Sequence, residues 1–312
     1  MSNENDELKP LSLDNSNTLK PLSLDSNNEN QRSSVPLLKT TTNEIKNRDS
    51  NFIFFFGNPQ SGKSVILSSI LYHLSSEAGV LRPTIGTPNS KEVQTLLYDF
   101  YENIRQGILP ERTTVGKVLE IDLVFEPNNK SKKVPTINLT FLEASGEDLR
   151  AIRRGGNFKT HISKYLSSNV PLTFIIVTSY DTADQDDTLI NEFLDELERQ
   201  RKNLRLISII LVISKWDLSG RMDVESEEEL DKFIQDNLRR TSQRFDANEL
   251  SKTFYTIGNV ESNDGKQKIT GLNLDTARVL SNWLYESIVG NPLDYEGTFW
   301  ERIKFSLQIN DK

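Results

Sequence analysis

The chain has 312 residues, enough for one large domain or two small ones, and its formal net charge of -8 argues against a general nucleic-acid-binding protein, whose surface is usually strongly basic. There is no cysteine, which excludes disulfides and thiolate chemistry, and the 2 histidines lie far apart in the sequence, which disfavours a histidine metal site. The longest apolar runs, such as residues 206–214, are too short to span a bilayer, and the first residues lack the pattern of a secretion signal. We therefore expect a cytoplasmic protein with no integral membrane segment and no nucleic-acid partner.

Residues 1–49 are predicted to form a disordered N-terminal tail. They are rich in Asn, Ser, Asp and Lys and poor in aromatic residues, so they cannot bury enough apolar surface to fold alone. The string "LKPLSLD" occurs at residues 8–14 and again at 19–25. This duplication is either a pair of docking motifs that bind one partner protein with avidity, or a repeat that arose in a tail under weak constraint.

A strand, a glycine-containing loop and a helix follow the tail in "NFIFFFGNPQSGKSVILSSILYHL". The spacing Gly57-x-x-x-x-Gly62-Lys63-Ser64 is that of a phosphate loop, in which glycines let the backbone amides approach an anion. Lys63 would reach the β- and γ-phosphates and Ser64 would bind Mg²⁺, whereas Pro59 donates no N–H. The predicted nucleotide-contacting residues of this loop are Gly57, Asn58, Pro59, Gln60, Ser61, Gly62, Lys63, Ser64 and Val65.

The next part of the chain predicts a helix and then two paired strands. The helix has Ser90 as its N-cap and ends near Gly107 and Pro110. Strands are expected at about 117–125 and 136–142, joined by a link that is too short to contain a crossover helix. We therefore expect these two strands to be antiparallel neighbours.

Two apolar runs further along predict buried parallel strands. The first covers residues 171–180 and is followed by a helix at about 187–202; the second ends in "SKWD" at residues 214–217. The Asp217 carboxylate could accept hydrogen bonds from both N1–H and N2–H₂ of guanine, and the Lys215 stem could lie over the base. A Lys-x-Asp string is weak alone, but here it stands at the end of a parallel strand, where ligands of open α/β sheets bind.

From about residue 50 to 289 the chain resembles the Ras-like (TRAFAC-class) P-loop GTPases, through its phosphate loop, its antiparallel strand pair and its Lys-x-Asp string. The strings "RQGILPERTT" (105–114) and "FLEASGEDLR" (141–150) are most similar to the bacterial double-GTPase group, although the chain contains only one phosphate loop. The resemblance implies an α/β P-loop NTPase three-layer sandwich. Its sheet would be mostly parallel with one antiparallel strand, and a helical insertion would precede the second strand. The GTPase domain would span 50–290, with a C-terminal extension at 291–312 that packs back on the domain.

The resemblance also implies roles for residues between the inserted helix and the second strand. Thr113 or Thr114 would close on Mg²⁺ and the γ-phosphate, and the two adjacent threonines are not distinguished by sequence. Arg112 is either a catalytic arginine supplied in cis or an exposed loop residue. Lys63, Arg112 and Thr114 are thus among the catalytic candidates.

Further roles fall on the turn after the 136–142 strand. Glu143 stands where the class usually has an Asp that holds Mg²⁺ through water; it would retain the metal role or leave a weakened site. The Gly146 N–H would contact the γ-phosphate. Glu147 replaces a water-orienting Gln and can accept but not donate a hydrogen bond as an ionised acid, so it would act as a base or give slow hydrolysis. The basic segment that follows, with Arg150 in it, is either a surface for an acidic partner or an ordinary solvated helix.

A last strand is predicted at 252–260, followed by a helix at 272–288. By the resemblance, residues 256–258 would contact the base through backbone amides, which makes Gly258 a candidate nucleotide-binding residue. The alternative is a strand end that contacts no ligand.

The resulting hypothesis is a slow Mg²⁺-dependent GTPase that binds GTP and GDP and acts as a nucleotide-controlled switch. Its partner would be a protein effector or regulator bound through the switch segments and the N-terminal tail. The alternative is a nucleotide-binding scaffold with little or no hydrolysis, which Glu143 and Glu147 keep open. An ATPase is disfavoured by Lys215 and Asp217.

Overall fold

The first strand of the domain lies near the centre of a seven-stranded sheet whose order is β2-β3-β4-β1-β5-β6-β7. The computed structural model describes residues 45, 47–110, 118–144, 160–200, 202–220, 227–263 and 266–296. Within them, β2–β3 and β3–β4 pair antiparallel and the other pairs are parallel, so β3 alone runs against the rest of this sheet. The strands are β1 Asn51–Phe56, β2 Gly79–Pro83, β3 Val118–Pro127, β4 Ile137–Ala144, β5 Leu172–Ser179, β6 Ser208–Ser214 and β7 Ser251–Phe254.

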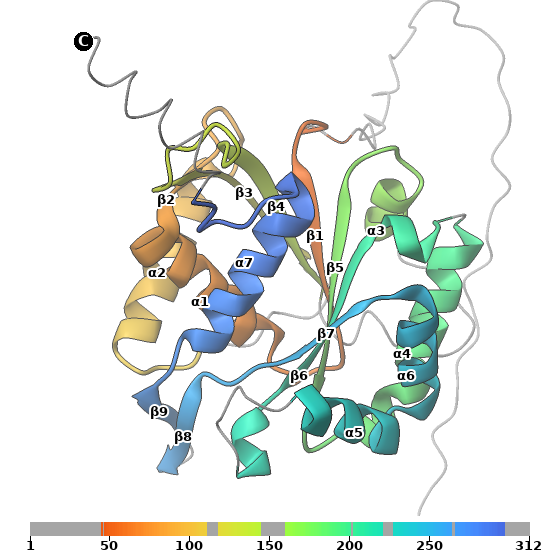
Figure 1. Ribbon diagram of the computed structural model, residues 1–312. Helices are drawn as coiled ribbons and strands as arrows, with labels where there is room; N and C mark the ends of the chain where they lie inside the picture. The colour runs from red at the N-terminus through yellow and green to blue at the C-terminus, as the bar shows by residue number, and fades with distance from the viewer. Residues whose placement is uncertain are drawn as a thin grey trace, which may run out of the picture. The chain divides into compact units, whose positions relative to one another are not determined.

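Helices cover both faces of the sheet (Figure 1). On one face lie α1 Lys63–His73, α2 Ser90–Arg105 and α7 Asp275–Val289; on the other lie α3 Thr160–Leu166, α4 Ala183–Arg199, α5 Glu227–Asn237 and α6 Arg239–Asn248. Short helical turns are η1 Leu74–Ala78, η3 Leu204–Leu206 and η4 Trp216–Ser219. The predicted three-layer α/β fold, with its mostly parallel sheet and one antiparallel strand, is confirmed.

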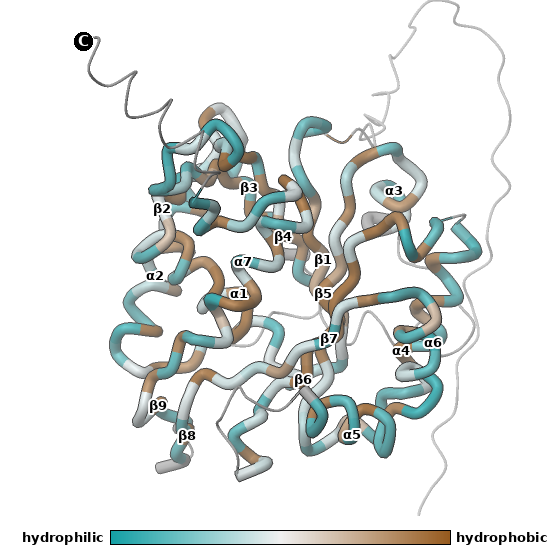
Figure 2. Tube along the Cα trace, in the orientation of Figure 1, coloured by the Kyte–Doolittle hydropathy of each residue, from teal (hydrophilic) through white to brown (hydrophobic). Residues whose placement is uncertain are grey.

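Strand β1 is apolar along its length because it faces a core on each side. Phe52, Phe54 and Phe56 pack towards α3 and α4, whereas Ile53 and Phe55 pack towards α1 and α7. This alternation follows from the pleat, in which successive side chains point to opposite faces. The resulting central band of hydrophobic residues is visible in Figure 2, and it fixes the loop after β1 at the carboxyl edge of the sheet.

The predicted strand at 252–260 is wrong as a single element. Strand β7 ends at Phe254, and a separate hairpin begins at Gly258, made of β8 Gly258–Asn263 and β9 Lys266–Leu272. The break occurs because the N–H of Thr256 donates to Thr276 Oγ1 at 3.2 Å, on the helix side, instead of continuing the ladder with β6.

Other differences concern boundaries and elements that the sequence did not predict. The helix expected from 187 begins at Ala183 and ends at Arg199, and the N-cap position of α2 is held by Asn89 rather than Ser90. Strand β2, the β9 strand and helices α5 and α6 were not anticipated. Because β2 precedes α2, the insertion after α1 contains an edge strand as well as the expected helix.

The ends of the domain extend beyond the sheet. Asn129, after β3, donates to the carbonyls of Leu293 (3.0 Å) and Tyr295 (2.9 Å), so the chain after α7 packs on the β3–β4 connection. Residues 1–44 and 297–312, which hold the duplicated string and most of the predicted C-terminal extension, lie outside the described residues. Within the described part, no helix has the length and apolar character needed to cross a membrane.

Ile45 lies inside the range assigned to the tail, yet it is only 7% exposed and belongs to the core on the α3–α4 side. Ile45→Ala should therefore lower the free energy of unfolding by about 2 kcal/mol, the lower end of the usual cost for truncating a buried isoleucine. Urea denaturation of the full chain measures this. Ile85→Ala is the matched control, because Ile85 is 97% exposed and should have little effect. Equal stability of the two variants would mean that residue 45 does not belong to the folded domain.

Candidate functional site

The loop between β1 and α1 is tightly curled and lies against the backbone of β5. Gly57 has a φ of 155°, and a Cβ built on it would lie 2.1 Å from the carbonyl oxygen of Val177 on β5. Gly62 has a φ of 89° and occupies the N-cap position of α1. Only glycine fits the first of these positions, since any side chain would collide with the β5 backbone. The loop therefore curls against the sheet edge as a phosphate loop would.

Lys63 is the cation beneath this loop. Its side chain is buried, and Nζ donates to the carbonyl oxygens of Gly57 (2.9 Å) and Asn58 (2.8 Å), which closes the loop on itself. Burial lowers the pKa of Lys63 to about 8, while the nearby carboxylates of Glu143 and Asp186 act in the opposite direction. Because its pKa stays above neutrality, the group offers a positive charge to an anion bound in the loop.

Ser64 and Glu143 meet beside Lys63. Ser64 Oγ donates to Glu143 Oε1 at 2.6 Å, and Glu143 is 1% exposed at the end of β4. Glu143 Oε2 is buried and has no hydrogen-bond partner in the described part of the chain. A buried carboxylate oxygen without a donor is costly unless a cation or water satisfies it. A hydroxyl and a carboxylate are oxygen ligands that suit Mg²⁺, so these residues fit the predicted metal.

Asp186 is a member of the site that sequence reasoning missed. It lies in the first turn of α4, is 2% exposed, and accepts hydrogen bonds from Thr178 Oγ1 (2.7 Å) and from the Asn58 side-chain amide. An acid in the first turn of a helix ordinarily complements the helix dipole at the surface. Asp184 and Asp187 stand in the same turn, and no pattern in the sequence distinguishes Asp186 from them.

The "SKWD" turn at the end of β6 contacts the phosphate loop directly. Ser214 Oγ donates to the carbonyl of Ser61 at 2.6 Å. Lys215 has a φ of 54°, and its Nζ lies 3.1 Å from each carboxylate oxygen of Asp181. Trp216 is 3% exposed and stacks on Phe254, with ring centroids 5.1 Å apart. The buried tryptophan anchors a turn that leaves Lys215 and the half-buried Asp217 at the surface.

A third loop, between β7 and β8, lies next to Asp217. Thr256 Oγ1 is 3.5 Å from Asp217 Oδ1 and accepts the N–H of Gly258 at 3.0 Å. The Gly258 amide is thus already bonded within the loop. A Cβ at Gly258 would lie 1.6 Å from the carbonyl oxygen of Gly271, so this glycine is required for the β8–β9 pairing.

The predicted site residues fall into those that the structure describes and those that it does not. The phosphate loop, Glu143, the "SKWD" turn and the 256–258 loop all come together at the carboxyl ends of the parallel strands (Figure 1). Five candidates lie outside the described residues: Arg112, Thr113, Thr114, Gly146 and Glu147.

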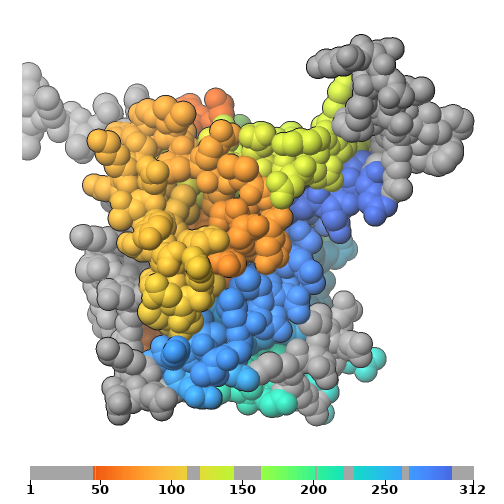
Figure 3. Space-filling view, turned by 90° about the vertical axis from the view of Figure 1, so that its left-hand side faces the viewer, coloured from red at the N-terminus to blue at the C-terminus, as the bar shows by residue number. Residues whose placement is uncertain are grey.

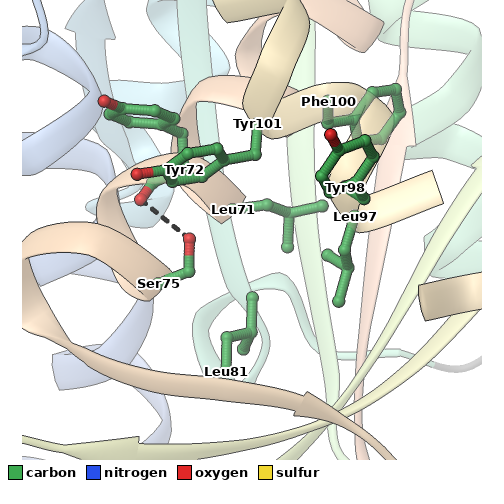
Figure 4. A pocket seen from close by; sticks show the side chains of 8 residues that line it. All are labelled: Leu71, Tyr72, Ser75, Leu81, Leu97, Tyr98, Phe100 and Tyr101. Atoms are coloured by element: carbon green, nitrogen blue, oxygen red, sulfur yellow. Dashed lines mark hydrogen bonds between the residues drawn. The ribbon is translucent and has the colours of Figure 1, made fainter. Parts of the chain in front are cut away.

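A pocket of about 200 Å³ lies elsewhere, between α1 and α2 (Figure 4). Its lining is mostly aromatic and aliphatic, with Tyr72 and Tyr101 stacked at 4.8 Å between ring centroids. No charged side chain lines it, so it offers nothing to hold a phosphate, whereas the strand-end loops present lysines and carboxylates. The candidate site is therefore the strand-end cluster.

Comparison with known proteins gives structural similarity only. No protein-family model and no curated protein matches the sequence. The signal recognition particle receptor SRb-GTP/SRX complex from Chaetomium thermophilum is 11% identical, over 76% of this chain and 98% of that chain, with a TM-score of 0.43. A probable GTP-binding protein engB is 16% identical, over 77% and 99%, with a TM-score of 0.36.

A third structure, Methanosarcina barkeri Roco2 RocCORdC bound to GDP, is 13% identical with a TM-score of 0.28. The match covers 64% of this chain but only 48% of that one, so this chain spans less than half of it. Because the TM-scores of the three structures lie below 0.5, the fold assignment rests on the strand order and on the loop geometry described above.

Gly258→Ala tests whether the hairpin geometry requires this glycine. The added methyl must push β9 away, so we expect a loss of more than about 2 kcal/mol in stability, above the roughly 1 kcal/mol at which single substitutions centre. Gly290→Ala is the matched control: Gly290 also has a positive φ, of 80°, but nothing lies within 4 Å of the position that an added Cβ would occupy. Thermal denaturation of both variants separates collision from backbone strain; equal melting temperatures would contradict the packing role.

Proposed function

We propose that this protein binds GTP and GDP with Mg²⁺ and acts as a slow GTPase, a switch controlled by its nucleotide. The observation that carries the proposal is the meeting of a phosphate loop with the "SKWD" turn, joined by the 2.6 Å bond from Ser214 to Ser61. The loop would fit a polyphosphate, and the neighbouring turn offers the carboxylate of Asp217.

The phosphates would accept hydrogen bonds from the backbone amides of the loop. Lys63 Nζ would leave the carbonyl oxygens of Gly57 and Asn58 and contact the negatively charged phosphates. Ser64 and Glu143 would hold Mg²⁺, which would neutralise negative charge developing on the phosphates. Asp217 would accept from the paired N1–H and N2–H₂ donors of guanine, and the Lys215 stem would cover the base. From the sequence alone, Thr113 or Thr114, Gly146 and Glu147 would complete the γ-phosphate side.

A nucleotide-binding scaffold with little hydrolysis is the second candidate. Its support is Glu143 and Glu147, which stand where the class usually has Asp and Gln. The bond from Ser64 to Glu143 favours neither candidate, because a hydroxyl that donates to a carboxylate can still bind Mg²⁺ through its oxygen. Single-turnover hydrolysis of GTP and of ATP by the purified chain distinguishes the candidates. Cleavage of GTP alone supports the switch; binding without cleavage supports the scaffold. In either case, we propose that an effector or regulator protein binds through the predicted switch segments and the N-terminal tail.

Asp217→Ala should abolish the preference for guanine while the fold persists. Losing hydrogen bonds to a charged acceptor should weaken GTP binding about ten- to hundredfold and leave ATP binding unchanged. Fluorescence titration with N-methylanthraniloyl derivatives of both nucleotides, in Mg²⁺, measures the ratio. Asp236→Ala, which removes an exposed acid from α5, should change neither affinity. Equal binding of ATP and GTP by the wild type would show that the base assignment is wrong.

Glu143 variants test the metal role. Glu143→Asp should keep GTP affinity within a few-fold, whereas Glu143→Ala should weaken binding about ten- to hundredfold with Mg²⁺ present, the cost of a hydrogen bond to a charged group. In EDTA, Glu143→Ala should bind GTP no worse than the wild type, because the carboxylate repels phosphate when no metal is bound. Isothermal titration in each buffer measures this. An alanine variant that matches the wild type in Mg²⁺-dependent binding and hydrolysis would remove Glu143 from the metal site.

A further inference from the structure

Asp186 connects three parts of the fold at one buried point. Its carboxylate accepts from Thr178 Oγ1 on β5 at 2.7 Å and from the side-chain amide of Asn58 in the phosphate loop, while its own backbone belongs to the first turn of α4. The side chain is 2% exposed. A carboxylate buried this deeply is costly unless it is well hydrogen-bonded, so these donors are needed to keep it there.

Asn58 is the residue through which this contact reaches the phosphate-binding backbone. Its carbonyl oxygen accepts from Lys63 Nζ at 2.8 Å and from the N–H of Ser61 at 3.3 Å. A hydrogen bond at its side chain therefore fixes the peptide that orients both the lysine and the turn of the loop. Asn58 itself is half-buried.

The neighbouring acid shows that this contact is not a general feature of the α4 terminus. Asp187 faces α6 instead, where it accepts from the Thr241 N–H (2.9 Å), the Thr241 hydroxyl (2.7 Å) and the Arg240 N–H (3.3 Å). Two adjacent carboxylates in one helical turn thus accept hydrogen bonds from different elements. One caps a helix, and the other reaches the loop proposed to bind phosphate.

We propose that Asp186 is a positioning residue of the nucleotide site: from α4 it holds Asn58, and so keeps the phosphate loop in the conformation that binds the nucleotide phosphates. The inference rests on the proposed nucleotide-binding function. Asp186 does not touch the nucleotide, because its carboxylate is engaged with Thr178 and Asn58. Its effect passes through the Asn58 peptide to the loop amides and to Lys63.

A charge-exchange experiment tests this. Asn58→Asp alone places two carboxylates against each other and should weaken binding of N-methylanthraniloyl-GDP at least tenfold, on the scale of a lost hydrogen bond to a charged group. In the double variant Asn58→Asp/Asp186→Asn, the new amide at 186 donates to the new carboxylate at 58 and its oxygen still accepts from Thr178. Affinity should then return to within about threefold of the wild type, as expected for groups that act as a pair.

Asn58→Ala provides a second measurement that does not introduce repulsion: it should weaken binding several-fold, and adding Asp186→Asn to it should weaken binding no further. Asp187→Ala is the matched control. It removes the hydrogen bonds to α6, so it should lower the melting temperature yet leave nucleotide affinity unchanged.

The outcomes separate the two proposals. A wild-type chain that binds no guanine nucleotide overturns the proposed function and this inference with it. A wild type that binds, together with a double variant that is no tighter than Asn58→Asp, overturns the positioning role alone. Equal loss of affinity in Asp187→Ala would do the same, because the effect would then follow from the stability of α4.

Discussion

The buried ammonium group of Lys63 is the charge on which the polar arrangement at this edge of the sheet depends. Burying an isolated charge is expensive, and here the loop carbonyls and the carboxylates of Glu143 and Asp186 offset that cost. Each carboxylate has its own donor, Ser64 or Thr178. The groups come from β1 and α1, from β4, and from β5 and α4, so the charge is tolerated only because the strand order places β4 and β5 on either side of β1.

The same arrangement leaves the site incompletely satisfied. Glu143 Oε2 and Ser61 Oγ are both buried and, within the described chain, without hydrogen-bond partners. Buried polar groups of folded proteins are nearly always hydrogen-bonded, and each exception calls for an explanation such as an ion, a water molecule or a catalytic role. These two atoms lie in or beside the phosphate loop, whereas two other such atoms, Glu192 Oε2 and Glu196 Oε2, lie on α4. The unsatisfied atoms at the loop are in keeping with the anion and cation proposed to bind there.

The chain just after α2 and the β8–β9 hairpin contact each other on one face of the molecule. The N–H of Ile269 in β9 donates to the carbonyl of Gly107 at 2.7 Å, and Ile108 forms a bridge with Lys268. Figure 3 shows α2 beside the elements from β8 to α7 on this face. The β8–β9 hairpin begins at the loop next to Asp217, so it joins that loop to the chain just before the predicted Thr113–Thr114 segment. The loop proposed to contact the base and the end of the insertion are thus packed together.

The sequence by itself determined the elements whose signals are local. The apolar run, glycine spacing and helix around Lys63, the short link that makes β3 and β4 antiparallel, and the "SKWD" turn all depend on residues within a few positions of one another. Their placement at one edge followed from the rule that parallel strands end together. These elements can be predicted without the rest of the chain, because turn geometry and the apolar pattern of a strand depend on residues that are close in sequence.

Only the tertiary structure decided the contacts made across long separations. The Asn58–Asp186 bond joins residues 128 positions apart, and nothing near Asp186 marks it as different from Asp187. The division of 252–260 into two strands likewise depends on Thr276, in a helix 20 residues beyond Thr256. Such partners depend on how the layers pack and on which buried polar group needs a donor. Both depend on residues throughout the fold and not on any one segment.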